Sequence, residues 1–295
     1  MCEGTILVTG GVGQLASALS AASSAVRRVG RPDFDFDRPD TVDAVFRAVH
    51  PALVINAAAY TAVDAAETDQ DAAYRANRDG PAQLARLCAA AGVPLIHVST
   101  DYVFDGCKGA PYTEDDVVAP TGVYGASKLA GEQAVLTSGA QAIVLRTSWV
   151  HYDTGKNFVR TMLTVGKTRD RLSVVSDQKG CPTAAADLGD AILAVAAQVL
   201  AGWRPEYAGV FHAAGGGATT WFGLACAVFE DAAAHGWKVP HVDPIATAEW
   251  PTPAKRPADS RLDCGRLARV FGVRLPPWRD GLRRSTGAIL AEADT

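Results

Sequence analysis

The sequence lacks any hydrophobic run long enough to cross a membrane, and its longest apolar stretches are short and rich in alanine. Its first residues, Met1-Cys2-Glu3-Gly4, also lack the basic start, the apolar stretch and the cleavage site of a signal peptide. Both absences favour a cytoplasmic protein that has no membrane partner.

A basic excess is also missing, because 28 Lys and Arg residues stand against 32 Asp and Glu residues, which leaves a net charge of -4. Such a chain cannot coat a nucleic-acid backbone, so we expect no nucleic-acid partner. None of the 6 cysteines forms a C-x-x-C pair, and no histidine pair completes a zinc motif. We therefore expect reduced thiols and no metal site.

What remains is the composition of a folded globular protein. The chain has 295 residues, of which 48% are hydrophobic and 20% are charged. This length is enough for one large or two moderate domains, each with its own buried core.

The first half of the chain alternates between short apolar runs and helical patterns. The expected strands cover residues 5–9, 52–56, 95–99 and 142–146, and a short, arginine-rich strand is expected near residue 27. The expected helices cover residues 14–25, 69–91 and 123–137. Strands that are apolar throughout and alternate with helices predict a parallel sheet with helices on both faces.

The regular alternation ends near residue 150. Helices are expected over 157–166, 187–200 and 221–235, a short strand over 172–175, and a final helix pair after a proline-rich stretch at 240–257. Residues 209–212 fit one more strand of the large sheet. We predict an α/β protein, namely a Rossmann-type doubly wound parallel sheet with a smaller mixed α/β C-terminal substrate domain.

A glycine-rich turn follows the first expected strand directly. Gly10 and Gly13 are spaced as G-x-x-G, and Ala16 occupies a third small position. Small residues are needed where a tight turn brings the backbone against a pyrophosphate, and the following helix offers free N–H groups. The turn therefore indicates dinucleotide binding.

The choice of dinucleotide depends on the end of the second strand. NAD-specific sites usually carry an acidic residue there, whereas this chain has Arg27, Arg28 and Arg31. Arg31 or Arg28 could meet a 2′-phosphate, which favours NADPH, although solvated surface arginines explain them almost as well. Asp35 and Phe36 could then bracket the adenine.

Tyr124 and Lys128 lie one turn apart at the start of an expected helix, on one face of it. A nearby ammonium group lowers the pKa of a phenol, which then can protonate a developing alkoxide. Thr100 follows the third apolar strand, at the carboxyl end where ligands bind in such sheets, and its hydroxyl could hold a carbonyl oxygen. Asn56-Ala57-Ala58-Ala59 leaves room for a flat cofactor.

These motifs together resemble those of the extended short-chain dehydrogenase/reductases, and most closely the dTDP-4-dehydrorhamnose reductase family. The resemblance covers nearly the whole chain. The matching motifs are Gly10-x-x-Gly13-Gln14-Leu15, Asn56–Asp64 with Glu67, Ser99–Gly106, Tyr124-Gly125-x-x-Lys128-x-x-Gly131-Glu132, Arg146–Val150, Asn157-Phe158, Asp177-Gln178-x-Gly180-x-Pro182-Thr183 and Arg256-Pro257-x-x-Ser260-x-Leu262-Asp263. One departure is Ala16 in place of the usual third glycine.

The resemblance implies reduction of the 4-keto group of a dTDP-4-dehydro-6-deoxysugar by NADPH, with NADH possible. The implied catalytic residues are Thr100, Tyr124 and Lys128. The cofactor-binding residues would be Gly10, Val12, Gly13, Gln14, Leu15, Arg31, Asp35, Phe36, Ala58, Ala59, Tyr60, Thr61, Tyr124 and Lys128. The substrate-binding residues would be Thr100, Asp101, Tyr102, Trp149, Asn157, Gln178 and Arg256. Core packing would explain the presence of Trp149 nearly as well as substrate binding does. Likewise, Asn157 could be a helix cap and Gln178 a turn residue.

The cofactor domain would span residues 1–150 with about 186–216, and the nucleotide-sugar domain about 151–185 and 217–295. The expected product is dTDP-L-rhamnose, and the chain would act as a monomer or homodimer. Alternatives are a related 4-ketoreductase that makes another deoxysugar or a streptose-type precursor, an epimerase or dehydratase of the same superfamily, and a non-catalytic NADP-binding regulatory subunit. Retention of Thr100, Tyr124 and Lys128 speaks against the last.

Overall fold

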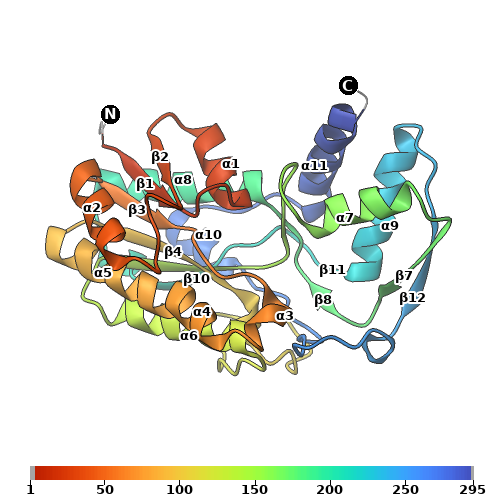
Figure 1. Ribbon diagram of the computed structural model, residues 1–295, viewed down its shortest axis with the longest axis horizontal. Helices are drawn as coiled ribbons and strands as arrows, with labels where there is room; N and C mark the ends of the chain where they lie inside the picture. Colours follow the sequence, from red (N-terminus) through yellow and green to blue (C-terminus); the bar gives the residue numbers. More distant parts are fainter. Residues whose placement is uncertain (1–3, 294–295) are drawn as a thin grey trace.

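The computed structural model describes residues 4–293, which form two lobes that lie side by side (Figure 1). The larger lobe contains a six-stranded sheet, and the smaller lobe contains three helices and short pairs of strands. Cys2 and residues 294–295 of the expected second domain lie outside the described residues.

The central sheet follows the expected Rossmann-type topology. Its strands are β1 (Ile6–Thr9), β2 (Val26–Val29), β3 (Leu53–Asn56), β4 (Leu95–Thr100), β5 (Ala142–Thr147) and β10 (Gly209–His212). They are ordered β10-β5-β4-β3-β1-β2, and every neighbouring pair is parallel. The chain passes from β1 to one edge and then returns to the other side of β1, so β1 and β3 border the switch point where such sheets bind ligands.

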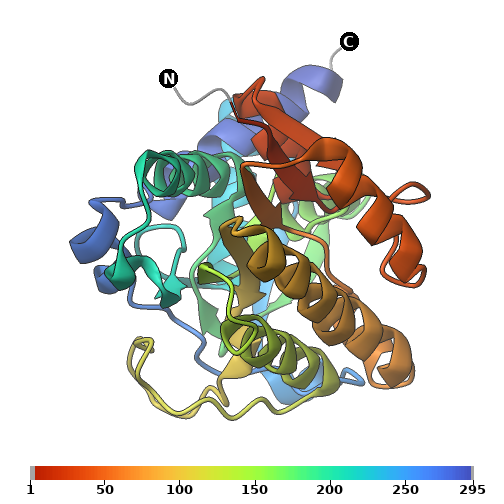
Figure 2. The same ribbon diagram turned by 90° about the vertical axis from the view of Figure 1, so that its left-hand side faces the viewer.

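Helices cover both faces of this sheet, as Figure 2 shows from the side of the larger lobe. On one face lie α1 (Gln14–Ala22), α8 (Ala185–Ala201) and α10 (Gly265–Phe271), and their buried leucines pack with Val8 and Ile55. On the other face lie α2 (Pro39–Val49), α5 (Gly80–Ala91) and α6 (Val123–Leu136). Burial on both faces explains why β1, β3 and β5 each begin with a run of apolar residues.

The segment between β3 and β4 differs from the single helix expected over residues 69–91. The chain forms α3 (Val63–Ala66), α4 (Gln70–Tyr74), a π-helical turn η1 (Arg75–Asp79) and then α5. Pro81 near the start of α5 cannot donate a backbone hydrogen bond, which favours an irregular turn just before it. Helix α2 was not expected, and its Pro39 stands at the helix start, where proline is tolerated.

The smaller lobe is built around α7 (Phe158–Gly166), α9 (Trp221–Ala234) and α11 (Trp278–Ala293), which share one apolar cluster. The strand β7 (Arg171–Val175) pairs in parallel with β12 (His241–Ile245), which lies in the proline-rich stretch and was not expected to be a strand. The remaining short pairs are β6 (Val150–His151) with β9 (Thr183–Ala184), and β8 (Lys179–Gly180) with β11 (Thr219–Thr220). Three short 3-10 helices are η2 (Asp101–Val103), η3 (Pro205–Tyr207) and η4 (Thr247–Glu249).

The five cysteines within residues 4–293 are free thiols, and Cys88 and Cys181 are buried. None of the helices in that range is both long enough and apolar enough to cross a membrane.

The close contact between α6 and the π-helical turn yields a stability test. A Cβ atom on Gly131 would overlap the carbonyl oxygen of Asn77, whereas one on Gly287 in α11 would meet nothing within 4 Å. We expect Gly131→Ala to lower the free energy of unfolding by about 2 kcal/mol or more, because backbone must move. Gly287→Ala, the matched control, should raise it by about 0.5 to 1 kcal/mol. Urea titrations of both variants measure this, and equal effects would contradict the packing argument.

Candidate active site

The glycine-rich turn lies against the end of β3, at the switch point of the sheet. Gly10 and Gly11 have φ angles of +114° and +54°, which favour glycine. A Cβ on Gly10 would lie 3.0 Å from the Ala57 carbonyl oxygen, and one on Gly30 would overlap Gly11. The small residues are therefore required by the close approach of three backbone segments.

This turn fits a bound dinucleotide. Gly13 precedes α1, whose N-terminus has no side-chain cap and no acidic residue in its first turn. Val12 is 89% exposed at the tip of the turn, while Leu15 is buried in the core beneath it. Free N–H groups at a helix start attract a phosphate, and no carboxylate here opposes it.

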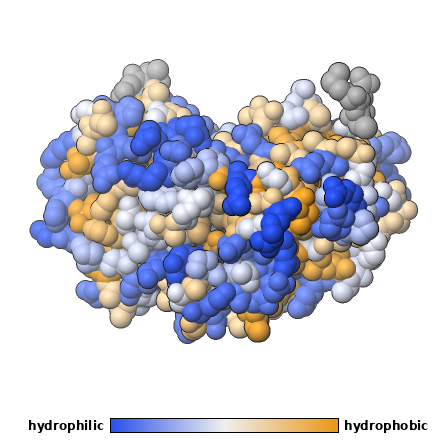
Figure 3. Space-filling view, turned by 180° about the vertical axis from the view of Figure 1, so that it is seen from behind, coloured by the Kyte–Doolittle hydropathy of each residue, from blue (hydrophilic) through white to orange (hydrophobic). Residues whose placement is uncertain are grey.

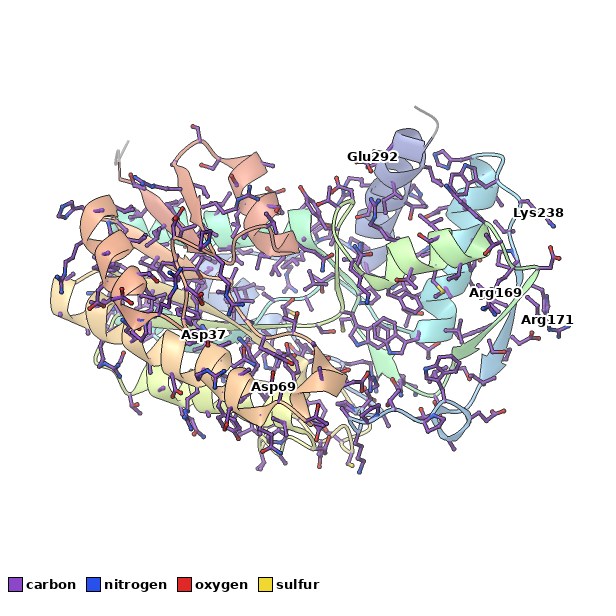
Figure 4. The ribbon with its side chains drawn as sticks, in the orientation of Figure 1. Asp37, Asp69, Arg169, Arg171, Lys238 and Glu292 are labelled. Carbon is purple, nitrogen blue, oxygen red and sulfur yellow. The ribbon has the colours of Figure 1, made fainter. Side chains whose placement is uncertain are left out.

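The residues expected to surround the adenosine end lie together beyond β2. Arg31 donates to Asp35 (3.0 Å) and to Asp37 (2.8 Å), and Arg75 donates to Asp37 (3.0 Å). Arg31 remains 68% exposed, so its guanidinium is paired but accessible. Figure 4 labels Asp37 in the larger lobe. Phe36 lies over Gly80, where a Cβ atom would overlap its ring.

The chain after β3 is fixed in place by hydrogen bonds to buried polar side chains. The Ala58 N–H donates to Thr9 Oγ1 and Asn56 Oδ1, both at 3.2 Å. Tyr60 exchanges two backbone hydrogen bonds with the side chain of Asn77, at 2.8 and 3.1 Å. Ala59 is partly buried and Thr61 is exposed, so this expected cofactor segment borders the surface beside the turn.

Thr100 and Asp101 lie at the carboxyl end of β4. The Thr100 hydroxyl donates to Asp101 Oδ1 (3.1 Å), and Asp101 Oδ2 has no hydrogen-bond partner among the described residues. Burial raises the pKa of Asp101 to about 6, and the hydroxyl groups of Ser260, Thr100 and Ser148 oppose this only in part. A buried carboxyl group with one free oxygen is suited to receive a ligand hydroxyl.

Tyr124 starts α6 opposite that strand end. Its ring meets the Tyr102 ring edge-on, with centroids 5.5 Å apart. Burial raises the pKa of Tyr124 to about 12, and Asp101 raises it further while the Thr100 hydroxyl opposes the shift. The pKa is thus raised rather than lowered as the spacing predicted, so the phenol keeps its proton at neutral pH.

Lys128 lies one turn along α6 and is 2% exposed. Its Nζ donates to the Val98 carbonyl oxygen (2.7 Å), which points the ammonium group at β4. Burial lowers the pKa of Lys128 to about 8, and the carboxylate of Glu132 opposes this shift. Thr100 from β4 and both Tyr124 and Lys128 from α6 therefore come to one edge of the sheet.

Trp149 follows β5 and has a φ of +47°, which is rare for a bulky residue. Its indole stacks on that of Trp221, with centroids 3.6 Å apart and an interplanar angle of 8°. The other side of the Trp149 ring lies over Gly180, where a Cβ atom would overlap it. The strained backbone therefore directs the indole from the sheet edge into the smaller lobe.

Gln178 lies beneath this pair of indoles and is buried. It accepts from Trp221 Nε1 (3.2 Å) and donates to Thr247 Oγ1 (3.1 Å). Asn157 caps α7 by accepting from the Arg160 N–H (3.0 Å), and it donates to the Gln14 side chain (3.0 Å). Asn157 thus links the smaller lobe to the glycine-rich turn.

Arg256 forms a two-pronged ion pair with Asp64, in which both N···O distances are 2.8 Å. It also donates to Thr252 and to the Ala254 carbonyl oxygen. This pair lowers the pKa of Asp64 through the hydrogen bonds and charge of Arg256. Arg256 and Asp64 join the proline-rich stretch to the segment after β3.

Sequence reasoning gave no role to Trp221 or Asp64. Trp221 contacts a predicted site residue, but no spacing rule relates it to Trp149, which is 72 residues earlier. Asp64 belongs to one of the motifs on which the family resemblance rests. The structure shows that its carboxylate forms an ion pair with Arg256.

The space between the lobes is open at one edge, where the surface in Figure 3 is notched. Arg169, Arg171 and Lys238, labelled in Figure 4, lie at the outer end of the smaller lobe, away from that notch. Arg171 pairs with Asp243 and Lys238 pairs with Asp170. Within the described part of the chain, no three His, Cys, Asp or Glu residues cluster as a metal site.

Comparison with known proteins identifies the family of the chain. The family described as the RmlD substrate binding domain matches residues 4–290. The chain belongs to this family. A Sinorhizobium fredii member named dTDP-4-dehydrorhamnose reductase is 44% identical over 290 residues, covering 97% of this chain and 98% of that protein.

Two solved structures of the same family extend this likeness to three dimensions. The dTDP-4-dehydrorhamnose reductase of Clostridium acetobutylicum is 35% identical with a TM-score of 0.90, over 97% of this chain and 99% of that one. The Bacillus anthracis reductase, solved in complex with NADP, is 34% identical with a TM-score of 0.87, over 95% and 98% of the two chains. Both confirm the expected family and fold class.

Asp101 yields a pH-dependent stability test. Its pKa is raised from 3.8 to about 6, so the folded protein binds more protons than the unfolded chain between these values. Stability is thus lost as the pH rises from about 4 to about 6, and it stays low above that. We expect Asp101→Asn to raise the free energy of unfolding by about 2 kcal/mol at pH 8 and not at pH 4. Urea titrations at both pH values measure this difference.

Asp33→Asn at an exposed position is the matched control, with an expected change within about 0.5 kcal/mol at either pH. A loss of stability in Asp101→Asn at pH 8 would show that the folded protein favours the carboxylate.

Proposed function

We propose that this protein is an NAD(P)H-dependent oxidoreductase that reduces the 4-keto group of dTDP-4-dehydro-β-L-rhamnose to give dTDP-L-rhamnose. The observation that carries this proposal is the meeting of Thr100, Tyr124 and Lys128 beside the glycine-rich turn, in a chain of this family. The family members described above are named for the same reaction.

The proposed cofactor is NADPH, with NADH possible, since the Bacillus anthracis relative is in complex with NADP. The bound dinucleotide would supply the hydride. Gly10, Val12, Gly13 and Gln14 would hold its pyrophosphate at the start of α1, above the buried Leu15. Ala58, Ala59, Tyr60 and Thr61 would border its nicotinamide half, and Arg31, Asp35 and Phe36 its adenosine half.

Tyr124 would donate the proton that the reduced oxygen needs. Its raised pKa keeps the phenol protonated at neutral pH, so a proton is present to give. Thr100, whose hydroxyl lies beside Asp101, would orient the keto oxygen. The ammonium group of Lys128 would stabilise the phenolate that remains and bind the nicotinamide ribose.

The sugar nucleotide would bind between the lobes. Asp101 and Tyr102 would contact the hexose, with Trp149 as an apolar wall that stands on Trp221. Gln178, Asn157 and Arg256 would lie toward the nucleotide, and Arg256 would exchange part of its pairing with Asp64 for a phosphate. No step needs a resident metal.

We assign cofactor binding to residues 4–150 with about 186–216, and sugar-nucleotide binding to about 151–185 and 217–293. Helix α10 belongs to the second range in sequence, yet it packs against the sheet of the first. We also propose a cytoplasmic protein that acts as a monomer or homodimer.

Replacing Tyr124 tests the reaction. With NADPH and dTDP-4-dehydro-β-L-rhamnose, the protein should oxidise the cofactor, and Tyr124→Phe should lower kcat by about 100- to 10,000-fold, because the proton donor is lost. Tyr74→Phe, a change in α4 outside the site, should leave kcat unchanged. The absorbance of NADPH at several pH values measures both variants.

A panel of dTDP-4-keto-6-deoxysugars with NMR of the products separates this activity from its alternatives. Faster reduction of another sugar would replace the substrate named above, and tightly bound NAD⁺ would favour an epimerase or dehydratase. An active Tyr124→Phe variant would disprove the proposed role of Tyr124, and lack of turnover by the protein alone would favour a regulatory subunit.

Arg31 decides the preference between the two cofactors. Arg31→Ala should raise the KM for NADPH about tenfold and leave that for NADH unchanged, since only NADPH has a 2′-phosphate. Arg28, which donates to Ser17 (2.8 Å), gives the matched control, because Arg28→Ala should change neither KM. A raised KM for NADPH in Arg28→Ala but not in Arg31→Ala would show that Arg28, rather than Arg31, binds the 2′-phosphate.

A further inference from the structure

A buried row of polar side chains crosses the sheet beneath α6. The strand register pairs Thr9 with Asn56, Asn56 with His97, Ser99 with Arg146, and Arg146 with His212. Except for Ser99, which lies two positions after His97 on the same strand, each of these residues follows an apolar residue two positions earlier that packs against α2, α5 and α6. The row therefore lies on that face of the sheet. All are at most 4% exposed, so water does not screen them.

One half of the row carries no charge. Thr9 Oγ1 donates to Asn56 Oδ1 (2.6 Å), and Asn56 Nδ2 lies 2.9 Å from His97 Nδ1. Burial and the nearby charge of Lys128 lower the pKa of His97 well below its usual value, so the ring stays neutral. His97 therefore adds no charge beside Lys128.

The other half holds a buried ion pair. Glu132 extends from α6 one turn beyond Lys128, and it accepts from Ser99 Oγ (2.5 Å), Arg146 Nε (2.9 Å) and Arg146 Nη2 (2.6 Å). Its side chain is 1% exposed and that of Arg146 is 4% exposed. Three donors therefore meet this one carboxylate, and two of them belong to the guanidinium group of Arg146.

The surroundings of Lys128 otherwise offer few charges. Tyr124 on α6, Tyr102, and Asp101 after β4 lie toward the sheet edge, and His97 is neutral. Among the charged groups on the other elements packed against α6, Asp64 is paired with Arg256. The others are exposed at the surface, namely Asp71, Arg75, Arg78, Asp79 and Arg86. Glu132 is the carboxylate whose charge opposes the loss of the ammonium proton at Lys128.

We propose that Glu132, held in place by Arg146 and Ser99, is a positioning residue that keeps Lys128 as an ammonium ion and so sets the alkaline limit of the reduction. The proposal rests on the role of Lys128 given above. Burial alone would favour a neutral amine, which could not stabilise a phenolate at Tyr124. The fixed negative charge one helical turn away counters that effect without touching the substrate.

Opposite charge changes at the two partners test this inference. Glu132→Gln removes the negative charge and leaves Arg146 unpaired, so the pKa of Lys128 and the alkaline limb of kcat should shift down by about one pH unit. Arg146→Gln removes the positive charge and leaves the carboxylate of Glu132 unpaired, so the pKa of Lys128 and the alkaline limb of kcat should both shift up. A structural role alone would lower activity in both variants without opposite shifts.

Ser99→Ala is the matched control, because it removes one hydrogen bond to Glu132 and keeps the charges of Glu132 and Arg146. The pKa of Lys128 and the alkaline limb of kcat should therefore stay unchanged. A buried ion pair can fail to tolerate loss of one partner, so the double variant Glu132→Gln with Arg146→Gln is the second test. In the double variant, the pKa of Lys128 and the alkaline limb of kcat should both lie below those of the wild type, since the charge of Glu132 acts on Lys128.

Two readouts separate this inference from the proposed function. Carbon-13 NMR of lysine Cε, assigned with Lys128→Met, measures the pKa of Lys128 without any substrate. Equal lysine pKa values in all folded variants would overturn the proposal whether or not the wild type is active. Shifted pKa values with an unmoved alkaline limb would refute its kinetic part. An inactive wild type with shifted pKa values would count against the proposed function alone.

Discussion

The position of α6 depends on close backbone contact at two glycines. A Cβ atom at Gly125 would overlap the Tyr102 carbonyl oxygen, as one at Gly131 would overlap that of Asn77. The helix is therefore clamped between the end of β4 and the π-helical turn. Because Tyr124, Lys128 and Glu132 all project from α6, this clamp determines where the phenol, the ammonium group and the buried carboxylate lie relative to the sheet.

Burial then determines which of these groups carry charge. Desolvation shifts the pKa of Asp101, Lys128, Tyr124 and His97 toward the neutral form of each side chain. Glu132 and Arg146 are also buried, and they form an ion pair joined by two hydrogen bonds. A sheet edge whose ionisable groups are shifted toward their neutral forms thus stands over a buried ion pair.

Much of the larger lobe could be predicted from the sequence, because local patterns carry the information. Apolar runs between glycine-rich turns identified its strands, and the Gly10–Gly13 turn identified the switch point. Contacts across long stretches could not be predicted: the β7–β12 pair joins residues about 70 apart, and the Trp149–Trp221 stack and the Asp64–Arg256 pair have no local signal. Motif resemblance located Trp149 and Arg256, but only the fold shows that each already has a partner.

The path of the chain between the lobes has a consequence for how the protein can be divided. The chain leaves the sheet after β5, returns for α8 and β10, leaves again for α9, returns for α10, and ends in the smaller lobe with α11. A fragment ending near residue 150 would lack the helices α8 and α10 and would expose the leucines of one sheet face. Neither lobe is a contiguous module, so exchanging the smaller lobe between relatives requires replacing three separate segments together. The two lobes are expected to unfold as one cooperative unit.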